Sequence, residues 1–519
     1  MKKIIFAIIL SYILFVSCSN KSEGIKSSSL VLSLRADPIY LNPVLAYEIP
    51  SLEVCSWIFN GLVKINSSLQ VEPDLAEKWE VTPDGLIWTF YLRKNVLWHD
   101  GTPFTAKDVK FTVEAVLSSD VNTFNRSLFL IDDKPVEVKI ISPYICEFRL
   151  PKPFAPFLYN LTLGIIPEHL LKGVDLNKCD FNKNPVGTGP FKFAHWRLGE
   201  EVLLLQNKSY FRGAPCLAQV IFRIIPEQQS RLIALESGQI DVASLPPKEF
   251  ARFEHRKDIN LYRWFDLQYD YLGFDLTNEL FKDRKVRQAI NYAIDKKQIL
   301  QAVLKGFGKP ATGPVPCSSW AYTASVQDYP YNPAKAEKLL KEAGWHKNSE
   351  GKLIKDKKIF RFKLEYGQGS ENFSRTAVYI QHYLNYLGME VEIRPVEFSV
   401  LVNQHAYPGK FEAMLLDWVE GPDPDWYIEW GCDEVERGMN FMSYCNPKVD
   451  EILKKARTIL DIEKRKELYA SFQQLVAVDA PYVFLWYPET IIAVKNKIKG
   501  LSTPGPCGLF IEKEKIYKQ

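Results

Sequence analysis

Strand-like and helix-like segments alternate along almost the whole of this 519-residue chain. Residues 88–93 (WTFYLR) and 220–225 are rich in aromatic and β-branched residues, which is typical of strands. Helical patterns are found in residues 105–117, 283–305, 332–344, 372–387, 448–460 and 462–478. The first begins at Thr105 and Asp108, which resemble a capping box, and the third at Asn332 and Pro333, which are typical of an N-cap and first turn. No repeat of fixed period and no long flexible linker interrupts them. Because a chain of this length is too long for one core, we expect two or three mixed α/β domains joined by several crossings.

The first residues are typical of an export signal. Lys2 and Lys3 precede an apolar stretch, residues 4–16, which is too short to span a bilayer as a helix of about 1.5 Å per residue. Residues 15–18 (FVSC) resemble a bacterial lipoprotein cleavage box, in which Cys18 would be acylated and become the mature N-terminus. We therefore expect an extracytoplasmic, lipid-anchored protein, with a polar tether up to residue 29. The alternative is a plain signal peptide with a free cysteine.

Composition and motifs argue against several classes of function. Apolar residues make up 46% of the chain and aromatic residues 13%, which supports large cores. Removing Lys2 and Lys3 lowers the formal net charge from +3 to +1, a balance that does not favour nucleic-acid binding. The seven histidines are scattered, none of the nine cysteines forms a C-x-x-C pair, and no catalytic motif is convincing. We expect no metal site, no cofactor and no enzymatic activity.

Several blocks of sequence, in a fixed order, carry a family resemblance. They are residues 73–113 (PDLAEKWEVTPDGLIWTFYLRKNVLWHDGTPFTAKDVKFTV), 185–191 (PVGTGPF), 225–243, 271–300, 336–345 (AEKLLKEAGW), 418–425 and 440–450 (NFMSYCNPKVD). Each block is modest alone, but together they resemble the family 5 extracytoplasmic solute-binding proteins. These are the peptide and nickel receptors of ABC importers.

The resemblance implies an α/β fold of the two-lobed periplasmic-binding-protein type, with mixed sheets flanked by helices and an extra subdomain. The chain would cross between the lobes twice, near residues 266–272 and 484–488, and the lobes would close over the ligand by a hinge motion. The expected division is a signal peptide at 1–18, a tether at 19–29, lobe I at 30–70, 187–268 and 488–519, an extra subdomain at 71–186, and lobe II at 269–487.

The function that the resemblance implies is capture of short peptides, from dipeptides to oligopeptides, and their delivery to an ABC permease. The protein would act as a monomer tethered to the membrane by its lipid. Two alternatives remain open: a receptor for a non-peptide solute such as a metal chelate or haem, and a signalling or surface protein that retains the fold.

A peptide held in a closed cleft needs an acidic group for its amine and an arginine for its carboxylate, because unpaired buried charge is costly. In dipeptide receptors of the family the arginine lies on the helix after the AGW segment, where Arg375 falls here. The alternative for Arg375 is a solvated helix arginine. Family members usually have a Trp, then two residues, then an Asp, all ahead of an Asp-Pro turn. Here the stretch between Trp418 and that turn is one residue shorter. Either Glu420 supplies the carboxylate that binds the peptide amine, or this amine anchor is lost. Asp423 is expected to form the Asp-Pro turn.

Other expected ligand contacts come from positions where family members line the cleft. They are Tyr47, Glu48 and Ser51 in the first lobe, the strand Gly187, Thr188 and Gly189, and the aromatic walls Tyr269, Tyr271 and Trp418. For each of them, ordinary packing is the alternative.

Cys432 and Cys445 flank a loop, DEVERGMNFMSY, just before a helix start at residues 446–447. A disulfide between them would close a loop of roughly 13 residues and contribute about 3 kcal/mol in the chain-entropy model. Dipeptide-binding members of the family carry a similar pair. We expect the other cysteines of the folded part to be buried thiols.

Overall fold

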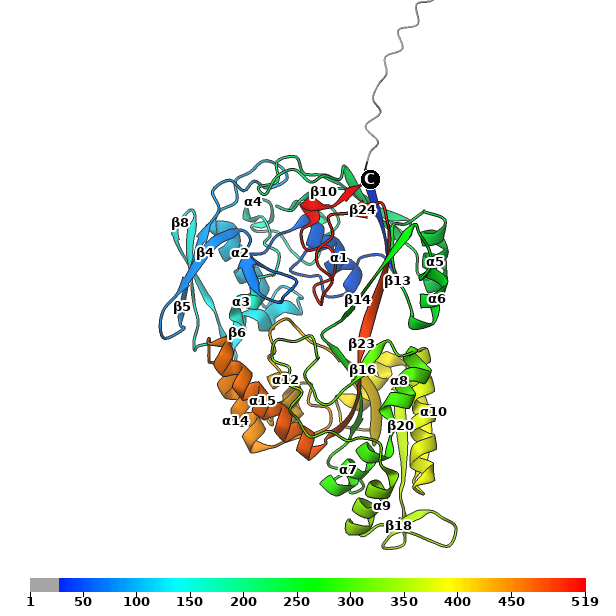
Figure 1. Ribbon diagram of the computed structural model, residues 1–519. Coiled ribbons are helices and arrows are strands. Elements are labelled where there is room, and N and C mark those ends of the chain that lie inside the picture. The colour runs from blue at the N-terminus through cyan, green and yellow to red at the C-terminus, as the bar shows by residue number, and fades with distance from the viewer. Residues whose placement is uncertain (1–27) are drawn as a thin grey trace, which may run out of the picture.

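The computed structural model describes residues 28–519. The chain forms two lobes stacked one above the other (Figure 1). The expected signal peptide at 1–18, its Cys18, and the tether up to residue 27 lie outside the described residues. Within 28–519, no helix is both long and apolar enough to cross a membrane.

Lobe I is built on a four-stranded mixed sheet. β1 (Ser29–Leu34) runs parallel to β12 (Gln219–Ile224), followed by β11 (Glu201–Gln206) and β10 (Phe191–Arg197). Alternate residues of β1 are buried, as expected for a strand with one face on a core. The other elements here are α1 (Ile49–Ile58), α5 (Gln228–Glu236), α6 (Phe250–Phe253) and the strands β2 (Val63–Ile65), β3 (Val71–Pro73), β24 (Ile498–Lys499) and β25 (Tyr517–Lys518).

An antiparallel sheet forms the extra subdomain at the left of Figure 1. Its strands, in spatial order, are β4 (Ala76–Val81), β5 (Ile87–Leu92), β9 (Ile145–Arg149) and β8 (Glu137–Ser142). α2 (Ala106–Leu117) begins with the predicted capping box, in which Thr105 and Asp108 each bond the backbone of the other. Shorter elements are β6 (Leu130–Ile131), β7 (Lys134–Pro135), α3 (Phe157–Asn160) and α4 (Glu168–Leu171).

Lobe II contains most of an eight-stranded sheet. The order is β13 (Val242–Ser244), β23 (Tyr482–Lys495), β15 (Gln268–Phe274), β22 (Ala413–Val419), β20 (Arg361–Gly367) and β21 (Glu390–Val396), and β14 (Ile259–Phe265) and β16 (Gly308–Pro310) also pair with β23. A small sheet holds β17 (His346–Lys347), β18 (Leu353–Lys355) and β19 (Lys358–Ile359). The helices are α7 (Arg284–Ala293), α8 (Lys296–Leu304), α9 (Pro333–Glu342), α10 (Glu371–Tyr386), α11 (Phe398–Val400), α12 (Tyr427–Trp430), α13 (Glu434–Arg437), α14 (Pro447–Ala456) and α15 (Ile462–Asp479).

One long strand, β23, passes from one lobe to the other (Figure 1). Its first part pairs with β15 and β16, and its second part pairs with β14 and β13. β14 and β15 are themselves consecutive, separated only by Asp266 and Leu267. The connection between the lobes is therefore two neighbouring antiparallel crossings, which is a suitable construction for a hinge. We propose the domain division expected from the sequence, with lobe II at 269–487.

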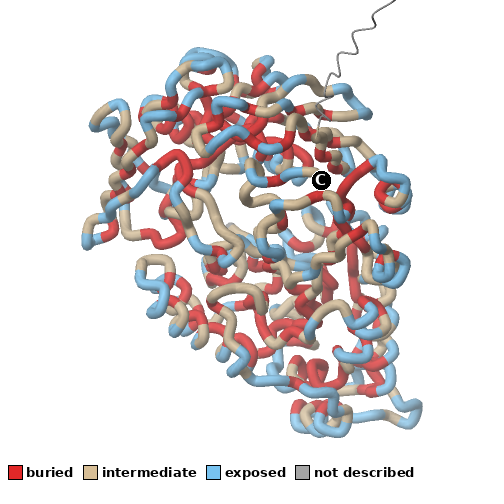
Figure 2. The backbone as a smooth tube through the Cα atoms, turned by 45° about the horizontal axis from the view of Figure 1, so that its top comes forward, coloured by how far each residue is buried: buried red, intermediate tan, exposed pale blue. Residues whose placement is uncertain are grey.

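The apolar cores follow the two lobes. One continuous cluster, which includes Leu30, Phe90, Phe148 and Phe222, joins lobe I to its extra subdomain. Separate clusters fill lobe II, and one of them is strongly aromatic. Buried segments accordingly run through the interior of both lobes, while the exposed segments are mainly outer loops (Figure 2).

The sequence pattern of residues 283–305 predicts one helix, but the structure has two. α7 ends at Ala293, and α8 begins after Asp295, whose carboxylate accepts a hydrogen bond from the backbone N–H of Gln298 at 3.0 Å. A short acidic side chain that caps a new helix competes with continuation of the old one. This is why apolar spacing alone overestimated the length of the helix.

Candidate ligand site

Two neighbouring strands of lobe II bring several of the predicted site residues together. β15 and β22 are antiparallel partners, and Tyr269 lies directly opposite Trp418. The Tyr271 ring stacks on that of Tyr482 with 4.3 Å between the ring centroids. Just past the end of β22, the backbone N–H of Glu420 donates to the Leu267 carbonyl at 2.7 Å. Glu420 is thereby held close to the hinge.

The short helix α12 adds a second acidic side chain, Glu429, between Trp426 and Trp430. The Trp430 ring lies 4.7 Å from that of Tyr482, so the helix packs on the same aromatic group. We call the following seven residues the Glu420–Glu429 cluster: Tyr269, Tyr271, Trp418, Glu420, Trp426, Glu429 and Trp430. Sequence analysis missed Glu429, Trp426 and Trp430, although an acidic residue between two tryptophans was an available signal.

The cluster is rich in buried polar atoms that have no partner. The hydroxyls of Tyr269 and Tyr271, the indole nitrogens of all three tryptophans, one oxygen of Glu420 and one oxygen of Glu429 are enclosed, yet form no hydrogen bond of good geometry with any residue in 28–519. The Trp426 indole is nevertheless close enough to the Glu420 carboxyl to lower its pKa slightly against the effect of burial. Buried polar groups in proteins are nearly always hydrogen-bonded, because leaving them unpaired is costly. Such a concentration at one place is typical of a site that a polar ligand completes.

Burial favours the protonated, neutral form of two carboxyl groups in this part of lobe II. Burial raises the pKa of Glu420 well above its usual range, and the nearby Glu429 raises it further. Burial also raises the pKa of Glu429 to about 8, with contributions from Asp425 and Glu434. Within residues 28–519, neither glutamate has a lysine, arginine or histidine within ion-pair distance. Both side chains are in a position to accept a cation.

Two other acidic residues of the same segment are already paired. Arg465 forms two hydrogen bonds with Asp423, at 2.6 and 2.7 Å, and both side chains are buried. Arg457 pairs with Asp425 at 3.0 Å. Asp423 and Asp425 thus fix the turn to α15 and α14, and this leaves Glu420 as the unpaired acid that follows Trp418.

Arg375 lies elsewhere on lobe II. Its guanidinium donates a hydrogen bond to the carbonyl oxygen of Ala302 at 2.7 Å, which links α10 to α8. Among residues 28–519, the Arg375 guanidinium and the Glu420 carboxyl form no hydrogen bond or ion pair with each other. One turn before Arg375, Glu371 pairs with Lys248 of lobe I at 2.7 Å. Arg375 therefore lies near the rim where the two lobes meet.

The lobe I residues expected at the site have mainly structural contacts. Glu48 caps α1 through the backbone N–H of Ser51, and the buried Ser51 hydroxyl accepts hydrogen bonds from the N–H groups of Ile39 and Tyr40. Tyr47 is 49% exposed, and its ring lies 4.7 Å from that of Phe124. Of these residues, Tyr47 is the one with free surface.

Gly187, Thr188 and Gly189 form an irregular segment rather than the strand expected from the sequence, and this segment is buried against the end of α1. A Cβ atom added at Gly187 would lie 1.9 Å from the Ile58 carbonyl oxygen, and the Gly189 N–H donates to that oxygen at 2.8 Å. Glycine is required here because the two backbones approach so closely. This segment therefore packs tightly on the last turn of α1.

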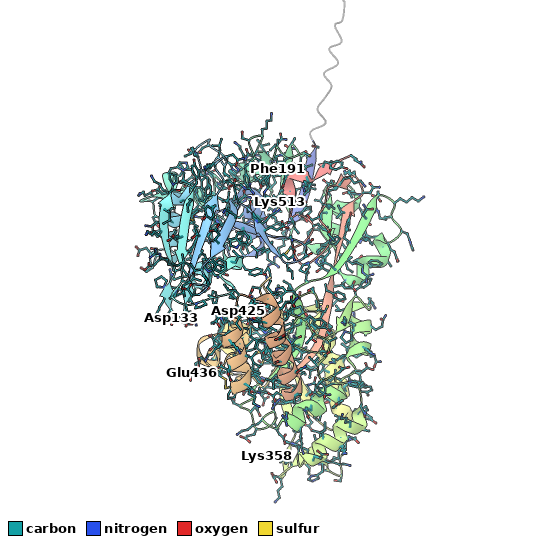
Figure 3. The ribbon with its side chains drawn as sticks, turned by 60° about the vertical axis from the view of Figure 1, so that its left-hand side comes forward. Asp133, Phe191, Lys358, Asp425, Glu436 and Lys513 are labelled. Carbon is teal, nitrogen blue, oxygen red and sulfur yellow. A yellow bond between two sulfur atoms is a disulfide. The ribbon has the colours of Figure 1, made fainter. Side chains whose placement is uncertain are left out.

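The largest cavity described here lies between the extra subdomain and lobe II. It has a volume of about 930 Å³ and is lined by Arg126, Asp133 and Phe154 on one side and by Tyr427, Glu434 and Arg457 on the other. Figure 3 shows Asp133 and Asp425 on opposite sides of the boundary between the lobes. A smaller groove of about 350 Å³ in lobe I includes Arg35, Arg231 and Trp264. These volumes are in the range of small-molecule and peptide sites.

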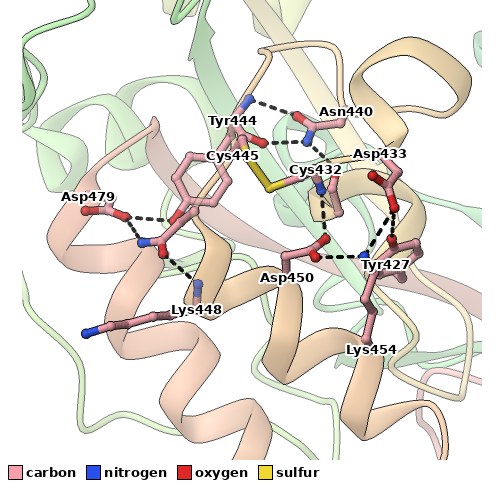
Figure 4. Close-up of a disulfide and its surroundings, with 12 residues drawn as sticks. Tyr427, Cys432, Asp433, Asn440, Tyr444, Cys445, Lys448, Asp450, Lys454 and Asp479 are labelled. Carbon is pink, nitrogen blue, oxygen red and sulfur yellow. Dashed lines mark hydrogen bonds and ion pairs between the residues drawn. A yellow bond between two sulfur atoms is a disulfide. The ribbon is translucent and has the colours of Figure 1, made fainter.

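A disulfide joins Cys432 to Cys445 in the structure, with their Cα atoms 4.7 Å apart (Figure 4). Inside the loop, Asn440 bonds the backbone of Gly431 and Tyr444, and the Tyr444 hydroxyl donates to Asp479 at 2.8 Å. The loop begins directly after α12. The disulfide therefore holds the segment that carries Glu429.

The two lobes, the hinge and the unpaired acidic cluster beside an inter-lobe cavity define a class of protein that encloses a small solute between closing domains. The family model for bacterial extracellular solute-binding proteins, family 5, matches residues 70–437. The chain belongs to this family, which consists of binding proteins rather than enzymes.

Similar proteins cover nearly the full length of the chain. The oligopeptide-binding protein AppA of Bacillus subtilis is 33% identical over 496 residues, covering 93% of this chain and 91% of AppA. The structure of that protein in complex with a nonapeptide has a TM-score of 0.79 at 32% identity, over 95% of this chain and 99% of the other. NikZ of Campylobacter jejuni in complex with Ni(L-His) has a TM-score of 0.81 at 30% identity, over 95% and 100%. The expected two-lobed α/β fold is confirmed.

Proposed function

We propose that this protein captures short peptides between its lobes and delivers them to the permease of an ABC importer. The observation that carries the proposal is Glu420, a half-buried carboxyl beside the hinge that has no basic partner in the described part of the chain. The ammonium group of a peptide would supply the missing charge, and the unpaired tyrosine and tryptophan groups would complete hydrogen bonds to the peptide backbone or to water.

The inter-lobe cavity suits the remainder of a peptide. Its lining mixes acidic, basic and aromatic side chains, and its basic groups, such as Lys454 and Arg457, are already paired with acids of the protein. A roomy lining of neutralised charges accepts varied side chains through water. Arg375 remains our proposed partner for the peptide carboxylate, because its single hydrogen bond leaves other donors of the guanidinium available.

The location of the protein is part of the same proposal. Cys18 would carry the lipid that holds the chain on the outer side of the cytoplasmic membrane or within the periplasm. One protomer contains both lobes, the hinge and the acidic cluster, and this supports action as a monomer.

Calorimetry with one tetrapeptide in free and N-acetylated forms tests the proposal, using wild type, Glu420→Gln and, as a control, the exposed Glu451→Gln on the same lobe. Removing one partner of a desolvated charge pair typically costs about 2–5 kcal/mol, or at least about thirtyfold in affinity. We expect acetylation and Glu420→Gln each to cause such a loss, and the two losses not to add. Equal affinity of wild type for both peptides would exclude Glu420 as the amine anchor.

A receptor for a non-peptide solute is the second candidate, and the similarity to the Ni(L-His) complex favours it. Mass spectrometry of small molecules that co-purify with the protein distinguishes the two. If a metal chelate or haem co-purifies and no peptide binds, the second candidate replaces the first.

A further inference from the structure

The Glu420–Glu429 cluster contains one more acidic group than a single ammonium can neutralise. Glu429 is half-buried, and its Oε2 atom is enclosed without a hydrogen-bond partner. The two nearest arginines of this segment are engaged, Arg457 by Asp425 and Arg465 by Asp423. If a ligand pairs with Glu420 alone, Glu429 must either hold a proton or remain an unpaired buried charge.

Polar groups that are fully buried point to the same place. The Tyr269 and Tyr271 side chains are 0% exposed, and both hydroxyls lack a partner. Glu420 and Glu429 each raise the pKa of both phenols, after burial itself, which places the two hydroxyls close to both carboxyls. The enclosure is therefore lined by unpaired groups from β15 and α12, and is more than a patch of surface acids.

The surroundings of Glu429 also suit an aliphatic cation. Trp426, just before α12, and Trp430, at its end, are buried and pack against aromatic rings of α15 and β23. Aromatic surroundings accommodate the apolar stem of a lysine or arginine side chain. Glu429 directly follows Tyr427 and Ile428, which line the inter-lobe cavity, although Glu429 itself does not line it.

We propose that the Glu420–Glu429 cluster selects peptides whose first residue has a cationic side chain, with the α-ammonium at Glu420 and the side-chain cation at Glu429. This inference rests on the proposed peptide-binding function and adds a preference to it. Glu429 is then a specificity-determining residue: it discriminates against neutral first residues because they leave a buried carboxyl unpaired.

Three tetrapeptides that differ only in the first residue test the preference: lysine, Nε-acetyllysine and norleucine, each followed by three alanines. Affinities are measured by calorimetry for wild type, Glu429→Gln, Glu429→Asp and the control Glu451→Gln. We expect wild type and the control to bind the lysine peptide at least about tenfold more tightly than the Nε-acetyllysine peptide. Glu429→Gln should reduce this ratio to near one, mainly by weakening the lysine peptide. Glu429→Asp, which keeps the charge, should retain part of the ratio.

The outcomes separate the preference from the function that underlies it. If wild type binds all three peptides equally, the preference is wrong and peptide binding stands. If the ratio persists in Glu429→Gln, the side-chain cation binds elsewhere and the assignment of Glu429 is wrong. If wild type binds none of the peptides, both proposals fail. The comparison of peptides on wild type needs no variant, so it remains decisive even if a substitution at Glu429 prevents folding.

Discussion

The backbone N–H of Ala155 donates a hydrogen bond to the carbonyl oxygen of Arg457 at 2.6 Å, and this contact joins the extra subdomain of lobe I to lobe II. The Arg457 guanidinium lies 5.1 Å from the centroid of the Phe154 ring and 4.9 Å from that of Tyr427. The same side chain pairs with Asp425. Arg457 therefore connects the cavity, the turn before α12 and the opposite lobe, in the arrangement that the lobes adopt when they meet.

Replacing Arg457 should weaken ligand binding by opening the lobes. Arg457→Lys keeps a positive charge for Asp425 but loses the planar contact with Phe154 and Tyr427. We therefore expect the ligand to dissociate three- to tenfold faster, which corresponds to about 1 kcal/mol in the activation free energy of release. Stopped-flow fluorescence measures the release. Phe154→Ala should have a similar effect that does not add to that of Arg457→Lys. Additive effects would mean that the two side chains do not act as one contact.

The role of Arg375 is tested with peptides whose C-terminus is free or amidated. If Arg375 binds the carboxylate, Arg375→Ala should weaken the free peptide by at least about thirtyfold and leave the amidated peptide nearly unchanged. Arg361→Ala, which removes an exposed surface pair with Glu390, serves as the control. If free and amidated peptides bind wild type equally well, Arg375 is not the carboxylate clamp.

Removing the disulfide should destabilise lobe II. The bond closes a loop with a sequence separation of 13, so we expect the Cys432→Ser/Cys445→Ser variant to lose about 2–4 kcal/mol in its free energy of unfolding. Denaturant unfolding with and without a reductant measures this, and the reductant should affect only wild type. Mass mapping of a non-reduced digest of exported protein checks the bond itself, and recovery of both residues as free thiols would contradict it.

Asp270 predicts a pH dependence of stability. Burial raises its pKa to about 7, and Asp417 on the next strand adds to the increase, although the Trp486 indole and the Gln268 amide both donate to its carboxyl group. Because the pKa in the folded state exceeds the unfolded value near 4, the stabilisation is complete below about pH 4 and is lost as pH rises through 7.

Asp270→Asn should therefore be more stable than wild type at pH 8, by on the order of 4 kcal/mol, and the difference should shrink toward pH 5. Thermal unfolding of both proteins across this pH range measures it. A difference between the two proteins that does not vary with pH would show that Asp270 does not titrate in this range.

Lipid anchoring is predicted from Cys18, which lies outside the described residues. Cys18→Ala should move the protein from the detergent phase to the aqueous phase in phase partitioning, because an acyl chain contributes most of the attachment. Wild type that is already found in the aqueous phase, like the variant, would argue for a plain signal peptide.

Local chemistry made much of the fold readable from the sequence. Thr105 and Asp108 predicted the start of α2, and Asn332 with Pro333 predicted the start of α9, because caps depend only on residues within one turn. The order of the family blocks indicated the two-lobed architecture. The Trp418 segment directed attention to Glu420, but it left open whether an anchor was retained.

Only the tertiary structure decided which acids are available to a ligand. Arg465 pairs with Asp423 and Arg457 pairs with Asp425 through contacts between segments that are distant in the chain, whereas no basic side chain in residues 28–519 pairs with Glu420 or Glu429. Likewise, the long strand β23 brings Tyr482 against Tyr271. Pairing and burial are properties of three-dimensional packing: a sequence specifies which charges exist, but whether a charge is neutralised depends on what the fold places beside it.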